Sequence, residues 1–85
     1  MSLRITTKKC GTMTVVQIAG NLRKQGASEL ERVCQSIAGP LCLDLATLQS
    51  IDAAGVRAIH TLEDNGAAVA GVSPYIQKLL ERPVH

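Results

Sequence analysis

The side chains of this sequence that could do chemistry are concentrated in one stretch. It contains Asp52, Arg57, His60 and Asp64. His60 has Asp64 four residues on, and a helix would place the two on one face, where a carboxylate can assist an imidazole as a base. No serine or cysteine nucleophile stands at a spacing that would complete a catalytic arrangement. We therefore expect no catalytic residues, and a protein that is not an enzyme.

The possible metal ligands are scattered along the chain. A protein metal site needs three or four converging donors, whereas His60 and His85 stand far apart and the three cysteines have no CxxC spacing. Cys34 and Cys42 fall in apolar segments and are expected in the core, while Cys10 adjoins a glycine and is expected at the surface. The sequence thus predicts no metal, no cofactor and no disulfide framework.

Asp52 precedes a segment with apolar residues at helical spacing, and this segment is closed by Asn65-Gly66. As the N-cap residue, its carboxylate can accept hydrogen bonds from the amides of Ala54 and Gly55. An anion could sit on the same amides, but the carboxylate already occupies that potential and would repel it. We expect the first turn of this helix to be the working surface of the protein, since α/β proteins often place theirs where a helix follows a strand.

Seven elements are predicted to position this surface. They are the strands Leu3 to Lys9, Met13 to Ala19, Leu41 to Leu45 and Ala67 to Val72, and helices from between Lys24 and Ser28 to Gly39-Pro40, from Asp52 to Gly66, and from Ser73-Pro74 to Pro83. The order β-β-α-β-α-β-α predicts an α/β fold with a mixed four-stranded sheet, in which the first strand is antiparallel and the others are parallel. Alternating polarity places the helices mainly on one face and leaves Arg4, Thr6, Gln17 and Asp44 on the other.

Short connections complete this prediction. Ser50 to Asp52 is expected to form a turn between the third strand and the central helix, and Gly20 to Arg23 a loop before the first helix. Two starts of that first helix stay open. Ser28 with Glu31 could form a capping box, which favours the later start, whereas the apolar stripe that begins at Ala27 favours the earlier one.

Composition limits the classes of function. The chain has 85 residues, enough for a single domain over residues 1–85, and with 46% hydrophobic residues but only one aromatic, Tyr75, its core must be aliphatic. The net charge of +2 includes no cluster larger than Lys8-Lys9 or Arg23-Lys24, so no nucleic-acid partner is expected. No apolar stretch approaches the length of a membrane span, and the start from Met1 to Arg4 does not have the apolar segment of a signal peptide. We expect no membrane insertion and a cytoplasmic protein.

Three stretches together resemble the STAS domain, from about Ile5 to Glu81. They read A-G-N-L at residues 19–22, L-D-L-A-T-L-Q-S-I-D-A-A-G-V at 43–56 and G-V-S-P-Y-I-Q-K-L-L-E at 71–81. This family includes bacterial anti-sigma factor antagonists, and it typically reads L-D-L, a few residues, and then D-[ST]-[ST]-G-[LV]. In the antagonists the second Ser or Thr of that motif accepts a phosphoryl group from a kinase that is also the anti-sigma factor. Here Asp52 and Gly55 match, but Ala54 stands at the acceptor position with Ala53 beside it.

The resemblance implies a non-enzymatic interaction domain that binds a regulatory partner without phosphorylation at the usual site, because alanine has no oxygen to phosphorylate. The partner surface would combine the Gly20 to Arg23 loop with the start and outer face of the central helix. The expected partner-binding residues are Asn21, Leu22, Arg23, Asp52, Ala53, Ala54, Arg57 and His60. Arg23 departs from the family, which commonly carries Asp at that position, so the partner's identity stays open.

The first partner implied is a kinase-like anti-sigma factor. Two alternatives stay open. In one, the chain is a small STAS subunit of an ABC-type lipid transport system and contacts its ATPase. In the other, it is a small-ligand or anion-binding module that uses the amides after Asp52.

Overall fold

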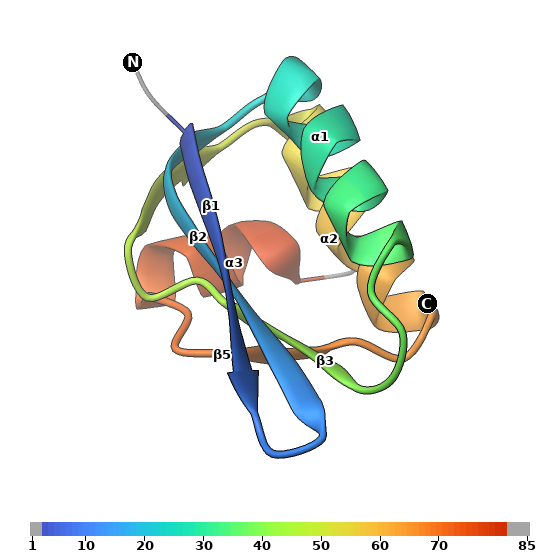
Figure 1. Ribbon diagram of the computed structural model, residues 1–85. Helices are drawn as coiled ribbons and strands as arrows, with labels where there is room; N and C mark the ends of the chain where they lie inside the picture. The colour runs from blue at the N-terminus through green and yellow to red at the C-terminus, as the bar shows by residue number, and fades with distance from the viewer. Residues whose placement is uncertain (1–2, 82–85) are drawn as a thin grey trace.

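The computed structural model describes residues 3–81 and shows one sheet with helices packed against it (Figure 1). The elements are β1 (Leu3–Cys10), β2 (Met13–Leu22), α1 (Lys24–Gln35), β3 (Leu41–Asp44), β4 (Leu48–Ile51), α2 (Ala53–Asp64), β5 (Ala68–Ala70) and α3 (Pro74–Leu80). Helices α1 and α2 lie side by side on one face of the sheet, and α3 packs against α2 and β4. The predicted α/β fold with helices mainly on one face is confirmed, but the sheet has one strand more than expected.

The sheet is built around β2. Strand β1 pairs with it antiparallel along its whole length, from Leu3 opposite Gly20 to Cys10 opposite Met13. On the other edge of β2, the first half pairs in parallel with β3 and the second half pairs in parallel with β4. Strand β5 completes the sheet beside β3, also in parallel. The mixed sheet with an antiparallel first strand is therefore confirmed.

The fifth strand corrects two predictions. The expected turn from Ser50 to Asp52 is mostly strand, because Leu48–Ile51 forms β4, and the expected loop from Gly20 to Arg23 is strand as far as Leu22. Both errors have one cause. The end of β2 is extended because β4 pairs with it, and a four-residue strand alternates too briefly to be told from a turn without that distant partner.

The core is aliphatic, as the composition predicts. Its largest fully buried side chains are those of Val16, Ile18, Leu22, Leu30, Leu43, Leu45, Ile59 and Ile76. Of the cysteines, Cys34 is buried, Cys42 is half-buried and Cys10 is exposed. On the opposite face of the sheet Arg4, Thr6 and Gln17 are exposed. Alternation within the strands thus separates an apolar face under the helices from a polar one.

The ends of α1 settle one open alternative and correct one prediction. The helix begins at Lys24, so the earlier start is right and Ser28 is not a cap. It ends at Gln35, well before Gly39-Pro40. Gly39 does adopt a left-handed φ of 94°, but within the connection to β3.

The other helix ends follow their local signals. Gly66 has a φ of 104° just after α2, which is the left-handed geometry predicted for it. The Ser73 hydroxyl caps α3 by accepting a hydrogen bond from the amide of Ile76 at 3.3 Å. Helix α3 ends at Leu80. The predicted stop at Pro83 and the second histidine, His85, lie outside the described residues.

Candidate partner-binding site

Helices α1 and α2 begin around one carboxylate, that of Asp52. Its Oδ1 accepts from the Gly55 amide at 2.8 Å, and its Oδ2 accepts from the Lys24 amide at 3.2 Å. The predicted cap of α2 is confirmed for Gly55, but the second bond goes to α1 instead of Ala54. One side chain therefore stabilises the positive ends of two helix dipoles and holds the two first turns together.

Gly55 brings the start of α2 close to the end of β2. A Cβ at this position would lie 2.6 Å from Ile51 Cγ1 and 2.8 Å from the Leu22 carbonyl oxygen, so only glycine fits. The same carbonyl accepts from the Asp52 amide at 3.1 Å. This close packing fixes the height of α2 above the sheet, and it leaves Ala53 exposed and Ala54 half-buried beside the buried glycine.

The expected partner-binding residues divide into exposed and structural ones. We use the name helix-start surface for five of them: Arg23, Asp52, Ala53, Ala54 and Arg57. Four of these residues are exposed, and Ala54 is half-buried. Leu22 is 0% exposed, so its side chain belongs to the core and not to a contact surface, which corrects that prediction. The reason is the extension of β2: a residue expected in a loop lies in a strand and faces the helices.

Two further predicted contacts are engaged inside the molecule. The Ser50 hydroxyl donates to Asn21 Oδ1 at 2.5 Å, which links β4 to β2 at a position where these residues are paired. The half-buried His60 donates from Nε2 to the Leu80 carbonyl oxygen at 2.7 Å, which ties α2 to the end of α3. The side chains of Asn21 and His60 therefore each connect two elements of the fold. His60 also lies about 10 Å along the helix axis from Ala53, away from the first turn of α2.

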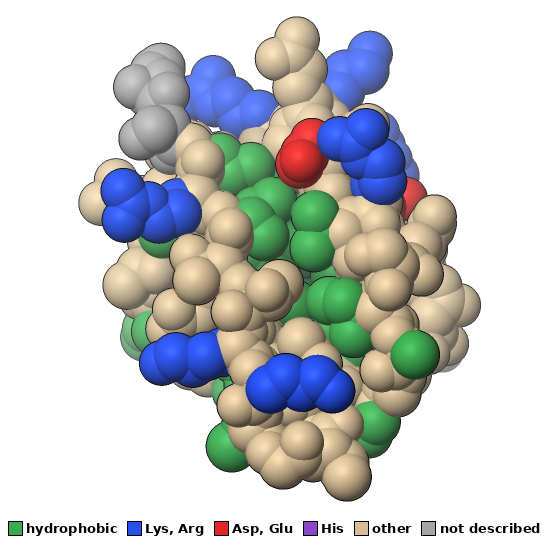
Figure 2. Space-filling view, in the orientation of Figure 1, with side chains coloured by type: hydrophobic (Ala, Val, Ile, Leu, Met, Phe, Trp, Pro, Cys, Tyr) green, Lys and Arg blue, Asp and Glu red, His purple; other side chains and the backbone are tan. Residues whose placement is uncertain are grey.

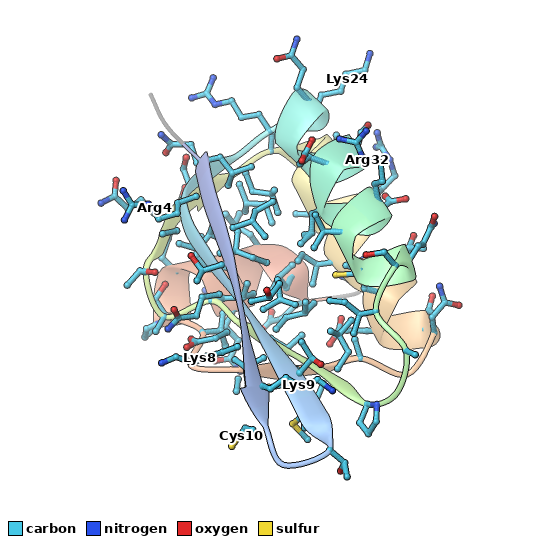
Figure 3. All side chains as sticks on the ribbon, in the orientation of Figure 1. Arg4, Lys8, Lys9, Cys10, Lys24 and Arg32 are labelled. Carbon is cyan, nitrogen blue, oxygen red and sulfur yellow. The ribbon has the colours of Figure 1, made fainter. Side chains whose placement is uncertain are left out.

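The helix-start surface is electropositive. Arg23 and Arg57 are exposed, Lys24 projects from the first turn of α1 (Figure 3), and neither α1 nor α2 has an acidic residue in its first turn. The Asp52 carboxylate is the exception, and its two oxygens are occupied by the capping bonds. A protein surface that docks here would therefore gain from carrying carboxylates.

Asp44, the other aspartate near a strand end, has a local role. Its Oδ1 accepts from the Ala46 amide at 3.0 Å, and its Oδ2 accepts from Gln17 Nε2 at 3.3 Å across the polar face of the sheet. Within residues 3–81, no three His, Cys, Asp or Glu side chains gather closely enough to hold a metal ion. No helix in the same part of the chain is both long enough and apolar enough to cross a bilayer.

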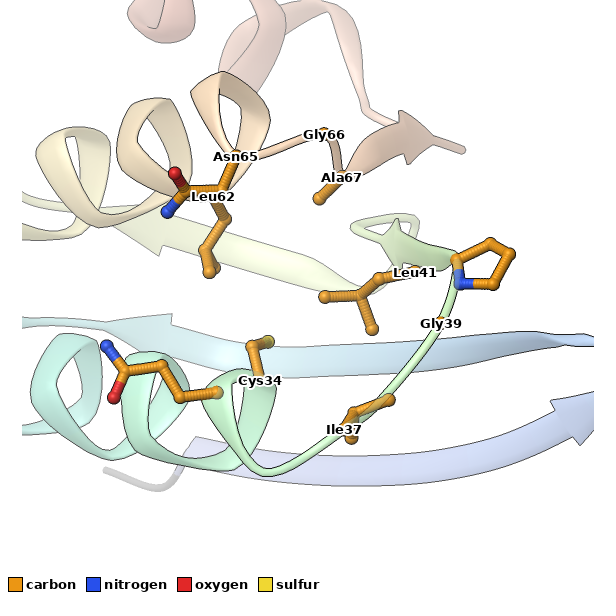
Figure 4. A pocket seen from close by; sticks show the side chains of 10 residues that line it. Cys34, Ile37, Gly39, Leu41, Leu62, Asn65, Gly66 and Ala67 are labelled. Carbon is orange, nitrogen blue, oxygen red and sulfur yellow. The ribbon is translucent and has the colours of Figure 1, made fainter.

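Concave regions lie away from the helix-start surface. One pocket of about 180 Å³ lies between the ends of α1 and α2, where Cys34 and Leu62 point into the same space (Figure 4). Burial raises the pKa of the Cys34 thiol above its ordinary value. Two others, of about 410 and 310 Å³, adjoin β1 and α3. None of these three pockets, all within residues 3–81, is lined by a residue of the helix-start surface.

The chain is similar to known proteins in its three-dimensional structure, but comparison of its sequence finds no match. No protein-family model matches the chain, and no curated protein matches it significantly. Unphosphorylated SpoIIAA, an anti-sigma factor antagonist, superposes with a TM-score of 0.66 at 15% identity, covering 92% of this chain and 80% of that one. The phosphorylated SpoIIAA of Bacillus gives 0.65 at 13% identity, covering 92% and 79%. A STAS domain from Rhodobacter sphaeroides, described as an antisigma-factor antagonist, gives 0.63 at 14% identity, covering 81% and 86%.

Proposed function

The chain has the SpoIIAA-like fold of STAS domains, and from this premise we propose that it is a non-enzymatic interaction domain. In this proposal it is a single domain that resembles an anti-sigma factor antagonist in role, and its helix-start surface binds a regulatory partner. A regulator of sigma factors works in the cytoplasm, so that compartment is part of the proposal.

One observation carries the proposal. Ala53 and Ala54 lie in the first turn of α2, reachable from outside, directly after the capping Asp52 and before the buried Gly55. The motif resemblance assigns the phosphoacceptor position to Ala54, and SpoIIAA is a protein solved in both phosphorylated and unphosphorylated forms. A phosphoryl group here would add a charge of about −1.5 to −2 beside the Asp52 carboxylate. Alanine cannot carry it, so the proposed complex forms without that switch.

The neighbouring hydroxyls do not replace the missing acceptor. Ser50 precedes the helix, is half-buried and already donates to Asn21. Thr61 is exposed, but it lies two helical turns beyond the first turn of α2. A phosphoryl group on either residue would stand away from Ala54, and would not place its charge at the centre of the helix-start surface.

The charge of the surface suggests what the partner presents. Arg57 follows the two alanines in α2 and Arg23 is the N-cap residue of α1, and neither helix has an acidic residue in its first turn. We therefore expect the partner to place carboxylates opposite these cations and small apolar contacts opposite Ala53. The first candidate is a kinase-like anti-sigma factor, and an ATPase of a lipid transport system is the second.

Affinity capture from the native host, followed by mass spectrometry, tests this proposal. The tagged wild-type chain is compared with Arg57→Glu, which reverses a charge of the surface, and with Lys78→Glu, which reverses an exposed charge on α3. We expect wild type and Lys78→Glu to retain a kinase-like anti-sigma factor and Arg57→Glu to lose it. Recovery of a transporter ATPase would replace the regulatory role with the transport role. Recovery of neither, or equal recovery by both variants, would contradict the proposed function.

A further inference from the structure

Strand β1 forms a long open edge of the sheet. Its eight residues pair with β2 in an unbroken register, and within residues 3–81 no other strand pairs with it. Figure 1 shows β1 at the front of the molecule, with no helix drawn over it. In an edge strand, alternate residues direct their amides and carbonyls outward, where another strand can pair with them. β1 contains no proline and no bulge, two of the devices that usually prevent such pairing.

The β1 edge is positively charged. Arg4, Lys8 and Lys9 are exposed on a strand with no acidic residue, and β2 carries no charged residue at all. Figure 3 shows Arg4 and Lys8 leaving the strand on one side and Lys9 on the other. A second copy of β1 would bring like charges together, which opposes self-association. An acidic strand would meet complementary charges instead.

The other side of the β1 edge carries an apolar strip, formed by Leu3, Ile5 and Ile37, that leads into a pocket with mostly polar walls. Leu3 packs on α1 so closely that a Cβ at Gly26 would lie 2.3 Å from Leu3 Cδ2. Ile5 and Ile37 are half-buried apolar residues on the same side, and Figure 2 shows apolar side chains between β1 and α1. Towards the end of β1 this strip opens into a pocket of about 410 Å³, lined by Thr7, Lys8, Lys9, Thr14, Ser36, Ile37 and Ala38. A strand added here would direct alternate side chains into this strip and pocket.

From these three features we infer that the β1 edge is a docking site for an extended acidic segment of another protein, which adds to the sheet as a sixth strand. Its carboxylates would lie beside Arg4 and Lys8 on the polar face, and its apolar side chains would lie on the strip formed by Leu3, Ile5 and Ile37. Main-chain hydrogen bonds would supply affinity and the alternating side chains specificity. This site is separate from the helix-start surface and does not depend on the function proposed for it.

Labelled peptides test the inference directly. The probe is a ten-residue peptide in which Glu alternates with Val, and its binding to the full chain is measured by fluorescence anisotropy. We expect the Glu peptide to bind and a peptide with Lys in place of Glu not to bind. The double variant Arg4→Glu/Lys8→Glu should weaken binding by roughly tenfold or more, since two attractions become repulsions. The control Arg32→Glu/Lys78→Glu changes the net charge equally at exposed positions of α1 and α3, and should leave binding close to that of wild type.

N-methylation of the peptide separates strand pairing from general charge attraction. Methyl groups are placed on alternate amides in two series, so that one series blocks one edge of the peptide strand and the second blocks the other. Strand addition predicts that one series loses binding to the wild-type chain while the other keeps it. Equal binding of the two series would overturn the inference, as would no binding of the Glu peptide or equal weakening by both double variants.

Discussion

Replacing Gly55 with alanine should destabilise the fold, because this glycine lies where the start of α2 meets the end of β2. The added Cβ would stand 2.6 Å from Ile51 Cγ1, 2.8 Å from the Leu22 carbonyl oxygen and 3.1 Å from Leu22 Cγ. The carbonyl cannot turn aside, since it is backbone and accepts from the Asp52 amide. The start of α2 would have to move by roughly half an ångström or more to restore ordinary contact distances.

The size of the effect follows from two opposing terms. Overpacking of this kind costs about 1–3 kcal/mol, and the better helix propensity of alanine returns about 1 kcal/mol. The free energy of unfolding should therefore fall by up to about 2 kcal/mol, which lowers the melting temperature of a domain of this size by up to roughly 16 °C. Thermal and urea unfolding followed by circular dichroism measure both quantities.

Gly26 provides the matched control, since it is also helical and also lacks a left-handed φ. A Cβ there would lie 2.3 Å from Leu3 Cδ2, but this atom is the far end of a flexible side chain and can move aside. Gly26→Ala should therefore change the melting temperature little, or raise it through helix propensity. If Gly55→Ala melts as high as Gly26→Ala, the reasoning from close backbone packing is refuted.

Three further predictions concern the cap, the missing acceptor and the buried thiol. Asp52→Ala should lower the free energy of unfolding by about 1–2 kcal/mol in urea titrations, while Asp52→Asn keeps an acceptor and should lose less; equal losses would contradict the capping role. Ala54→Ser should take up a phosphoryl group from a kinase-like partner and ATP, seen by intact mass, and then leave the complex, whereas a phosphorylated wild-type chain would contradict the proposal. Because burial raises the pKa of Cys34, the unfolded chain loses this thiol proton at a lower pH than the folded chain, so stability should fall as pH rises above the ordinary value of 9.0. In Cys34→Ala, the free energy of unfolding should decrease less steeply with pH above 9.0, as measured by urea titrations at several pH values. An unchanged dependence on pH would contradict this role of the buried thiol.

The features that the sequence predicted act over a few neighbouring residues. The Asp52 carboxylate reaches the Gly55 amide three residues on, and Ser73 reaches Ile76 in the same way. Gly66 ends α2 through its own backbone conformation. Alternation along β1 and β2 also gave the polar and apolar faces, because a pleated strand imposes a period of two whatever its partners are.

The features that the sequence did not predict depend on distant pairing. Strand β4 exists because Leu48–Ile51 meets the end of β2, and this pairing also turns Leu22 from a loop residue into a core residue. The second cap of Asp52 spans 28 residues to the Lys24 amide. No local pattern marks such contacts. The start of α2 and its cap could be located from the sequence, whereas which residues are exposed around them required the fold.

Hydrogen exchange of the chain with and without its captured partner tests the central claim most directly. The first amides of a helix have no intrahelical acceptor, so those of Ala53 and Ala54 should exchange fast in the unbound chain. If the helix-start surface binds the partner, these amides slow in the complex while that of Tyr75, in the first turn of α3, does not. Protection elsewhere, with unchanged exchange at Ala53 and Ala54, would contradict the account.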